Sequence, residues 1–196
     1  MVVMASGTGT LLEALIDRAH APDAPFEVSA IVIDRPCRAG DIAGREGIPL
    51  IRCEVADHVD RAAWDVALAQ AVGGVDPEFV VTAGFMKILG PAFLTRFGGR
   101  IVNSHPALLP SFPGAHGVAD ALAYGVTVTG ATVHLVDEGV DTGPILAQAP
   151  VMISPGDTEK TLHERIKSVE RILLTGVVAK LVSRGVVIDG RKAYIP

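Results

Sequence analysis

The stretch "VVMASGTGTLLEALIDRAH", Val2 to His20, contains the strand, turn and helix from which the fold of this chain can be predicted. "VVMA" is a short apolar run typical of a buried strand, and the glycine-rich "SGTGT" follows it at once. "LLEALIDRAH" then carries apolar residues at helical spacing, namely Leu11, Leu12, Leu15, Ile16 and Ala19. A strand, a turn and a helix in this order are typical of an α/β fold.

The same alternation continues through the first hundred residues. Further strands are predicted at 26–34, 48–53 and 78–85, with helices at 37–47 and 60–72. The last of these strands, "EFVVTAGF", is mostly apolar, as a buried parallel strand is. We therefore predict an α/β fold: an open, mostly parallel twisted sheet, Rossmann-like, with helices on both faces.

The second half of the chain changes character. A strand at 100–105 runs into a proline-rich loop, and a short helix is predicted at 117–125. Two more strands are predicted at 129–136 and 144–153. Polar and apolar residues alternate along the first, which indicates weaker burial and hence an antiparallel hairpin. The remaining predicted elements are a long helix at 157–185 and a small strand at 186–188.

Composition and charge exclude several classes of protein. The chain has 196 residues, 49% of them hydrophobic, which suits one domain with a sizeable core. Its net charge of −5 disfavours nonspecific nucleic-acid binding, which needs a basic surface. No apolar run reaches the roughly 18–20 residues that span a bilayer, and the start "MVVMASG" lacks the features of a signal peptide. Because Cys37 and Cys53 form no CxxC pattern, we expect no disulfide framework and a cytoplasmic location.

Polar loops follow three of the predicted strands, and ligands of open α/β sheets bind at the carboxyl ends of strands. The first loop, Ser6 to Thr10, lies at a helix start, where free backbone N–H groups and the helix dipole favour a phosphate. Gly7 and Gly9 would let an anion approach the backbone. The loop matches neither GxGxxG nor GxxxxGK[ST], so neither a dinucleotide nor a triphosphate is indicated. The residues alone leave open a plain tight turn in which Thr10 caps the helix.

Asn103, His105 and Asp141 form a second candidate site. Asn103 ends a strand and His105 lies two residues further on, so both project to one side if the strand continues. An amide beside a histidine can stabilise an oxyanion, and a nearby Asp141 would orient the imidazole and raise its pKa. No Ser or Cys nucleophile is needed if the substrate supplies its own. The residues alone leave open a turn-capping Asn, a packed His and a solvated Asp.

The third stretch, "AGFMKILGP" at 83–91, places Phe85, Met86, Ile88 and Leu89 at the end of a strand. These residues could line a slot for a flat aromatic ligand, or they could simply pack in the core. The other histidines and the cysteines are scattered, so no metal site is predicted. Two of those histidines, His116 and His134, could support the second site.

Taken together and in this order, these stretches resemble the phosphoribosylglycinamide formyltransferases, folate-dependent enzymes of purine synthesis. The resemblance covers nearly the whole chain. Its most specific part is "NSHPALLPSFPG" followed by "GATVHLVDEGVDTGPILAQ", and "SGTGT", "AGFMKILGPAF" and "LHERIKSVER" also match. The resemblance implies transfer of the formyl group of 10-formyltetrahydrofolate to the amine of glycinamide ribonucleotide, with no metal.

The resemblance also implies roles for individual residues. Asn103, His105 and Asp141 match the catalytic residues of the family, with His105 acting in its protonated form. The phosphate and ribonucleotide positions are Gly9, Thr10, Leu11 and Glu170. The folate positions are Arg61, Met86, Lys87, Ile88, Leu89, Asn103, Val136 and Val140. A single domain, 1–196, would then have a mainly phosphate-binding half, 1–100, and a mainly folate-binding and catalytic half, 101–196.

Two positions depart from the family pattern. Leu11 stands where the family often has Asn, and Lys87 where it commonly has Arg, which keeps the charge but loses bidentate geometry. The alternatives are a formyltetrahydrofolate deformylase, in which water replaces the amine, and a non-catalytic nucleotide- or folate-binding module. A methionyl-tRNA formyltransferase would need a further tRNA-binding domain and a basic surface. The oligomeric state is left open, although the long helix or exposed strands could form a homodimer.

Overall fold

The first half of the chain builds a parallel sheet. In the computed structural model, which describes residues 1–196, the chain divides into two units, Met1–Val102 and Asn103–Pro196. The strands of the first unit follow the order β3-β2-β1-β4, and each neighbouring pair is parallel. They are β1 (Val2–Ala5), β2 (Ala30–Ile33), β3 (Leu50–Arg52) and β4 (Val80–Thr82). The parallel sheet predicted for this half is confirmed.

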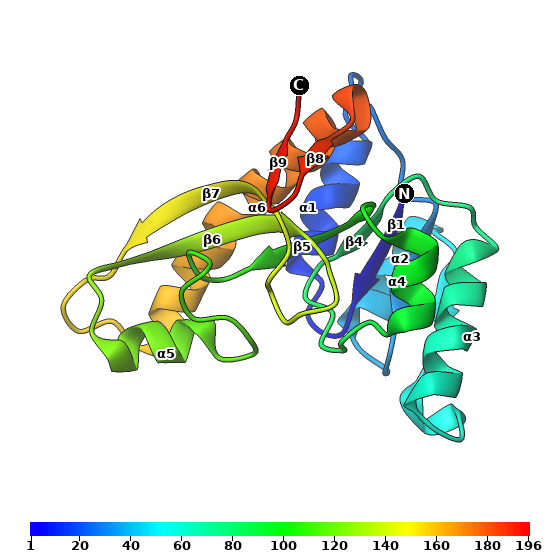
Figure 1. The fold of residues 1–196 in the computed structure, drawn as a ribbon, viewed down its shortest axis with the longest axis horizontal. Coiled ribbons are helices and arrows are strands. Elements are labelled where there is room, and N and C mark those ends of the chain that lie inside the picture. The colour runs from blue at the N-terminus through cyan, green and yellow to red at the C-terminus, as the bar shows by residue number, and fades with distance from the viewer. The chain divides into compact units, whose positions relative to one another are not determined.

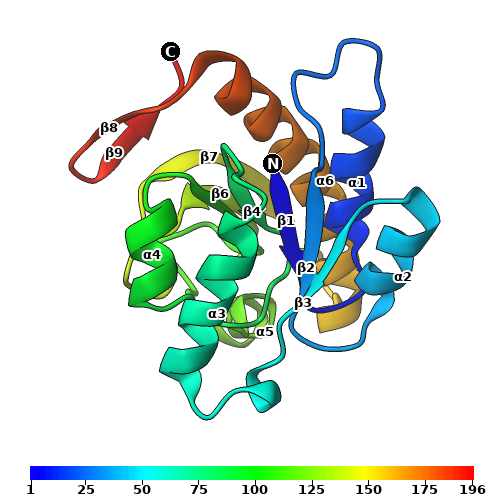
Figure 2. The same ribbon diagram turned by 90° about the vertical axis from the view of Figure 1, so that its right-hand side faces the viewer.

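Helices cover both faces of this sheet. Figure 2 shows α1 and α2 on one face and α3 and α4 on the other. Their bounds are α1 (Thr10–Ala19), α2 (Arg38–Glu46), α3 (Arg61–Gly73) and α4 (Pro91–Phe97), with a 3-10 turn η1 (Val55–Asp57) before α3. The core is formed where the apolar faces of these helices meet strands that are fully buried, as β1 is along its whole length. The helical spacing predicted for α1 is confirmed, since Leu11, Leu12, Leu15 and Ile16 are buried.

The second unit is built on an antiparallel pair. Its elements are the end of β5 (Ile101–His105), α5 (Gly117–Tyr124), β6 (Val128–Leu135), β7 (Ile145–Met152), α6 (Glu159–Arg184), β8 (Val187–Asp189) and β9 (Lys192–Tyr194). Strands β6 and β7 pair antiparallel, as predicted, with an irregularity at Val133/His134. Helix α6 runs along this pair (Figure 1).

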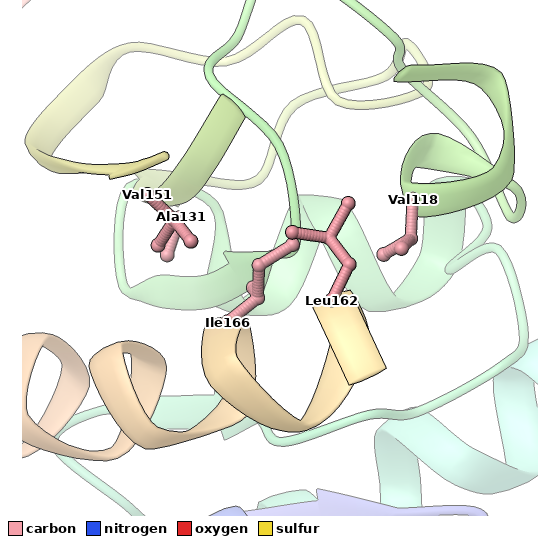
Figure 3. Packing of buried hydrophobic residues seen from close by; sticks show 5 residues of the cluster. All are labelled: Val118, Ala131, Val151, Leu162 and Ile166. Atoms are coloured by element: carbon pink, nitrogen blue, oxygen red, sulfur yellow. The ribbon is translucent and has the colours of Figure 1, made fainter. Parts of the chain in front are cut away.

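Strand β6 is buried more completely than its alternating sequence suggests. Seven of its eight residues are buried, so the expected weaker burial is wrong although the antiparallel pairing is right. One face is covered by α6 and α5: Figure 3 shows Ala131 facing Leu162 and Ile166, with Val118 beside them. The other face is covered by the proline-rich loop, because the Thr132 hydroxyl bonds to that loop's backbone.

The main differences from the prediction are short elements. Helix α4 was not predicted because it has only seven residues and follows Gly90 and a first-turn proline. Strand β9 was not predicted either, since three residues at a chain end carry no clear periodicity. Strand β2 starts at Ala30 rather than at residue 26. No helix of the structure is both long and apolar enough to cross a membrane.

Candidate active site

Side chains from three separate segments of the second unit converge on Asp141. His105 Nδ1 lies 3.3 Å from Asp141 Oδ2, and Asn103 Nδ2 donates to Asp141 Oδ1 at 3.4 Å. His134 Nε2 lies 3.5 Å from the same Oδ1, and the backbone N–H of Gly114 donates to Oδ2 at 2.7 Å. The three residues singled out in the sequence therefore meet at one point.

The Asp141 carboxylate is stabilised in its charged form. Burial raises its pKa, but hydrogen bonds from His134 and Gly114 and the charge of His105 together outweigh burial. The net effect holds the pKa of Asp141 below its usual value. Its backbone is left-handed, with φ 54°, a conformation that Asp tolerates better than most residues. A fixed negative charge therefore faces two histidines and an amide.

Burial lowers the pKa of His105, whereas it raises that of Asp141. The side chain is 4% exposed, and desolvation lowers the pKa of His105, whereas Asp141 and the hydrogen bond to the Phe112 carbonyl raise it. Burial outweighs both, so the pKa lies below the usual histidine value. The expected effect of Asp141 on the pKa of His105 has the right sign, although burial has the larger effect. His105 Nε2 donates to the Phe112 carbonyl at 2.8 Å, which leaves Nδ1 facing Asp141.

His134 completes the cluster and lies against the Asn103 amide. It is 2% exposed, and its Nδ1 lies 2.9 Å from the Leu135 carbonyl, which can only accept. In the neutral ring the proton therefore sits on Nδ1, and Nε2 can accept from Asn103 Nδ2 at 3.1 Å. In the imidazolium form Nε2 also carries a proton and can donate to Asp141 Oδ1 instead. His116, the other supporting candidate, is exposed at the start of α5. In the sequence, the only sign of a supporting role for His134 was its place on the strand that precedes Asp141.

The proline-rich loop after β5 holds the imidazole from the other side. Thr132 of β6 donates its hydroxyl to the Ala107 carbonyl at 2.7 Å and accepts from the Leu109 N–H at 3.0 Å. Gly117 allows this close approach, because a Cβ there would lie 2.9 Å from the Phe112 carbonyl oxygen and 3.2 Å from His105 Nε2. The hairpin thus sets the shape of the loop, and the loop restrains His105.

The loop between β6 and β7 is closed by Asp137. Its Oδ1 accepts from the Thr142 hydroxyl at 2.6 Å and from the Gly139 N–H at 3.1 Å. Two residues matched to folate positions lie in this loop: Val136 is half-buried, and Val140 is 48% exposed. The loop thereby presents apolar surface next to Asp141.

The residue between Asn103 and His105 is hydrogen-bonded to a buried carboxyl group. Ser104, between Asn103 and His105, donates its hydroxyl to Glu170 Oε1 at 2.7 Å. Glu170 belongs to α6 and is 4% exposed, and burial raises the pKa of its carboxyl despite the Ser104 hydrogen bond. Glu170, matched to a substrate position, thus connects α6 to β5.

The glycine-rich turn in the first unit leaves the start of α1 without a side-chain cap. Gly9 is the N-cap, in the left-handed conformation with φ 71°, and Thr10 is the first helical residue rather than the cap. The N-cap residue therefore offers no side-chain acceptor to the N–H groups of the first helical turn. Glu13, the acid in that turn, is held by Arg38 at 2.7 Å, and this hydrogen bond is the main reason why the pKa of Glu13 is lowered.

The stretch matched to the folate segment exposes two apolar side chains. Met86 and Ile88 are 65% and 64% exposed, while Leu89 is buried. Arg61 of α3, another predicted folate residue, donates to the Ile88 carbonyl at 2.5 Å and lies 4.3 Å from the centre of the Trp64 ring. The structure thus brings Arg61 and the 86–89 segment together.

Asp65 of α3, which holds the backbone directly after this segment, was not identified from the sequence. Asp65, which is 4% exposed, accepts from the N–H groups of Gly90 and Ala92, both at 2.8 Å. Its carboxylate thereby caps α4. The available signal was an acid next to Trp64 and three residues before Leu68 on a helix whose core face is apolar.

Comparison with known proteins identifies the class of protein to which this fold belongs. The family described as "Formyl transferase" matches residues 1–178, and the chain belongs to this family. A phosphoribosylglycinamide formyltransferase of Mycobacterium tuberculosis is 60% identical over 193 residues, covering 98% of this chain and 89% of that protein. The crystal structure of glycinamide ribonucleotide transformylase 1 from Symbiobacterium toebii superposes with a TM-score of 0.96 at 36% identity, over 99% of this chain and 92% of that one. That of phosphoribosylglycinamide formyltransferase from Bacillus halodurans gives 0.90 at 39% identity, over 93% and 94%.

Proposed function

We propose that this chain transfers the formyl group of 10-formyltetrahydrofolate to the amine of glycinamide ribonucleotide, the step of purine biosynthesis for which its relatives are named. The observation that carries the proposal is that Asn103 and His105 each lie within 3.4 Å of the Asp141 carboxylate. These groups are donors and acceptors without a nucleophile, which suits a reaction whose nucleophile belongs to the substrate.

The chemical step needs one new bond, one broken bond and one proton transfer. The amine nitrogen attacks the formyl carbon, and the carbonyl electrons move to oxygen to give a tetrahedral oxyanion. The bond from the carbon to N10 of the folate then breaks, while a proton passes from the amine to N10. The protein has to stabilise the oxyanion and guide that proton.

Asn103 and His105 are the proposed oxyanion donors. Asn103 directs its amide nitrogen at His134 and Asp141, so one N–H can serve the formyl oxygen while a neighbour keeps the other. As the oxyanion forms, a second negative charge favours the imidazolium form of His105 and opposes the effect of burial. Asp141, ionised at neutral pH, is proposed to position the water that carries the proton.

The ribonucleotide phosphate is proposed to bind at the start of α1, through backbone N–H groups of Gly9, Thr10 and Leu11. The uncapped helix start and the left-handed Gly9 support this assignment. Leu11 is buried at 8% exposure and faces the core, so its backbone would serve rather than its side chain. Glu170 is proposed to contact the ribonucleotide as well, through the carboxyl held by Ser104.

The folate is proposed to bind along Met86, Lys87, Ile88 and Leu89, with Arg61 fixing the backbone of this segment. Val136 and Val140 would add apolar contacts from the loop that carries Asp141. The exposed side chains of Met86 and Ile88 support the assignment, because ligand sites are lined mainly by apolar groups. In this proposal residues 1–100 bind the phosphate and carry this folate segment, and residues 101–196 carry the catalytic residues and add Val136 and Val140 to the folate site.

The proposed setting is the cytoplasm, with two small-molecule substrates and no metal. Two unpaired cysteines, Cys37 and Cys53, suit a reducing compartment.

One assay tests the proposed reaction. The purified protein is mixed with 10-formyltetrahydrofolate, and the absorbance change on loss of the formyl group is followed with and without glycinamide ribonucleotide. Consumption that requires the ribonucleotide, with formylated product seen by mass spectrometry, is expected. Equal consumption without the ribonucleotide would show that the protein is a deformylase. No consumption in either case would favour a non-catalytic binding module.

A further inference from the structure

The first unit contains a buried carboxylate that no step above uses. Asp34 directly follows β2, and none of its side chain is exposed. Arg35 approaches it from outside, with Nη2 at 2.9 Å and Nε at 3.2 Å from Oδ2. A buried carboxylate is costly unless it is paired and hydrogen-bonded, so its remaining partners indicate what it holds in place.

One of these partners is Ser6, in the glycine-rich turn. Ser6 and Asp34 directly follow Ala5 and Ile33, which are paired between β1 and β2, so the two residues lie side by side, and Ser6 helps to lower the pKa of the Asp34 carboxyl. The Ser6 oxygen also accepts from the backbone N–H of Met86 at 2.8 Å, and the Ser6 N–H donates to the Gly84 carbonyl at 3.1 Å. Because the Ser6 oxygen accepts from Met86, its one hydrogen is left to donate, and the neighbouring Asp34 carboxylate is a suitable acceptor.

The other partner is Lys87, in the middle of the folate segment. Its Nζ lies 3.5 Å from Asp34 Oδ2, and its side chain is 29% exposed. Lys87 therefore points its charge inward at Asp34. Between them, Ser6 and Lys87 connect this one carboxylate to both the turn that starts α1 and the segment at 86–89.

We propose that Asp34 is a positioning residue that joins the glycine-rich turn and the 86–89 segment, so that binding of the ribonucleotide and binding of the folate depend on each other. The proposal rests on the assignment of these two segments to the two substrates. Its physical basis is a closed network: moving either segment would separate a buried carboxylate from one of its partners. The substrate that orders one segment therefore favours the bound conformation of the other.

The first test compares Asp34→Asn with Arg35→Gln. Asparagine keeps the shape and can still accept from Ser6, but it loses the charge that holds Lys87. We expect KM to rise about 5- to 20-fold for both substrates, with kcat changed less than about threefold. Arg35→Gln removes only the exposed partner, whose side chain is 46% exposed, and should keep both KM values within about twofold.

The second test measures the coupling itself. The Kd of tetrahydrofolate is determined by calorimetry, in the absence of oxygen, with and without saturating glycinamide ribonucleotide. In the wild type the ribonucleotide should change this Kd at least about fivefold, and in Asp34→Asn the ratio should fall toward one. A wild-type ratio of one, or an unchanged ratio in the variant, would overturn the proposal.

A merely structural role for Asp34 predicts a different pattern. In that case Asp34→Asn would lower kcat in step with the folded fraction and leave both KM values alone, which would also overturn the proposal. If this variant does not fold, Ser6→Ala replaces it, since it breaks the link to Met86 and keeps the Lys87 pair. Ser6→Ala should likewise bring the Kd ratio toward one, and an unchanged ratio counts against the proposal. Failure of the proposed function would appear separately, as a wild-type protein that does not formylate the ribonucleotide.

Discussion

The glycine-rich turn and the cluster around Asp141 both offer hydrogen-bond donors, but they are built from different parts of the chain. At the turn the donors are backbone N–H groups, and the conformation of Gly9 decides where they point. Around Asp141 the donors are side chains from β5 and β6, and a charged partner orients them. The first site should therefore be sensitive to backbone conformation, and the second to charge and tautomer.

The largest effect is expected from Asp141→Asn. In the wild type, Asn103 and the Gly114 N–H donate to the two different carboxylate oxygens of Asp141. An asparagine amide has only one acceptor oxygen, and it carries no charge to orient His105 and His134. Turnover should fall by about 10²–10³-fold, as measured by the absorbance change on loss of the formyl group, while the circular dichroism spectrum stays that of the wild type. Asp137→Asn, in the same loop, is the control and should lose less than about tenfold, because its amide oxygen can still accept from Thr142 and Gly139. A near-normal rate for Asp141→Asn would remove this residue from the mechanism.

A backbone change should affect the turn instead. Gly9→Ala puts a Cβ at a left-handed position, 2.6 Å from the end of the Ile42 side chain. The left-handed conformation alone costs about 1–2 kcal/mol, and we expect KM for the ribonucleotide to rise about tenfold with a lower Tm. Gly7→Ala, where a Cβ would meet nothing within 4 Å, is the matched control. Equal KM values for the two variants would contradict the assignment of the phosphate to this turn.

The charge of Asp141 should also be visible in the titration of His105. Since burial lowers the pKa of His105 and Asp141 raises it, the midpoint measured by NMR should lie below the usual histidine value. In Asp141→Asn it should move lower still, because the group that favours the imidazolium is lost. An unchanged midpoint would show that Asp141 does not act on His105 electrostatically.

The smallest effect concerns Glu170. Its folded pKa is raised by burial, so the folded state holds a proton more tightly than the unfolded state and stability falls as pH rises through that raised pKa. Glu170→Gln should therefore raise Tm by about 2–4 °C above that pH and by less at pH 4, with weaker ribonucleotide binding. Glu164→Gln on the same helix is the control: Lys167 lowers the pKa of Glu164, so no gain is expected. A gain that is the same at both pH values would show that the charge of Glu170 is not its cause.

Much of the fold followed from local pattern. In α1 the apolar spacing identified the buried face, and the apolar runs of β1 and β4 identified buried strands. Strand β6 shows the limit of this reasoning. Its alternation predicted one exposed face, but the proline-rich loop folds back and covers that face through Thr132.

By itself the sequence determined the parallel sheet, the antiparallel hairpin and the order of the polar loops, because strand and helix periods are set by residues close together in the chain. It also supplied the candidates Asn103, His105 and Asp141. Only the tertiary structure decided that His134 lies against the Asn103 amide, that burial outweighs Asp141 in the pKa of His105, and that Asp34 lies beside Ser6 and Lys87. Each of these depends on a distance or a degree of burial between residues far apart in the chain, and hydrogen bonds and desolvation act only through such proximity.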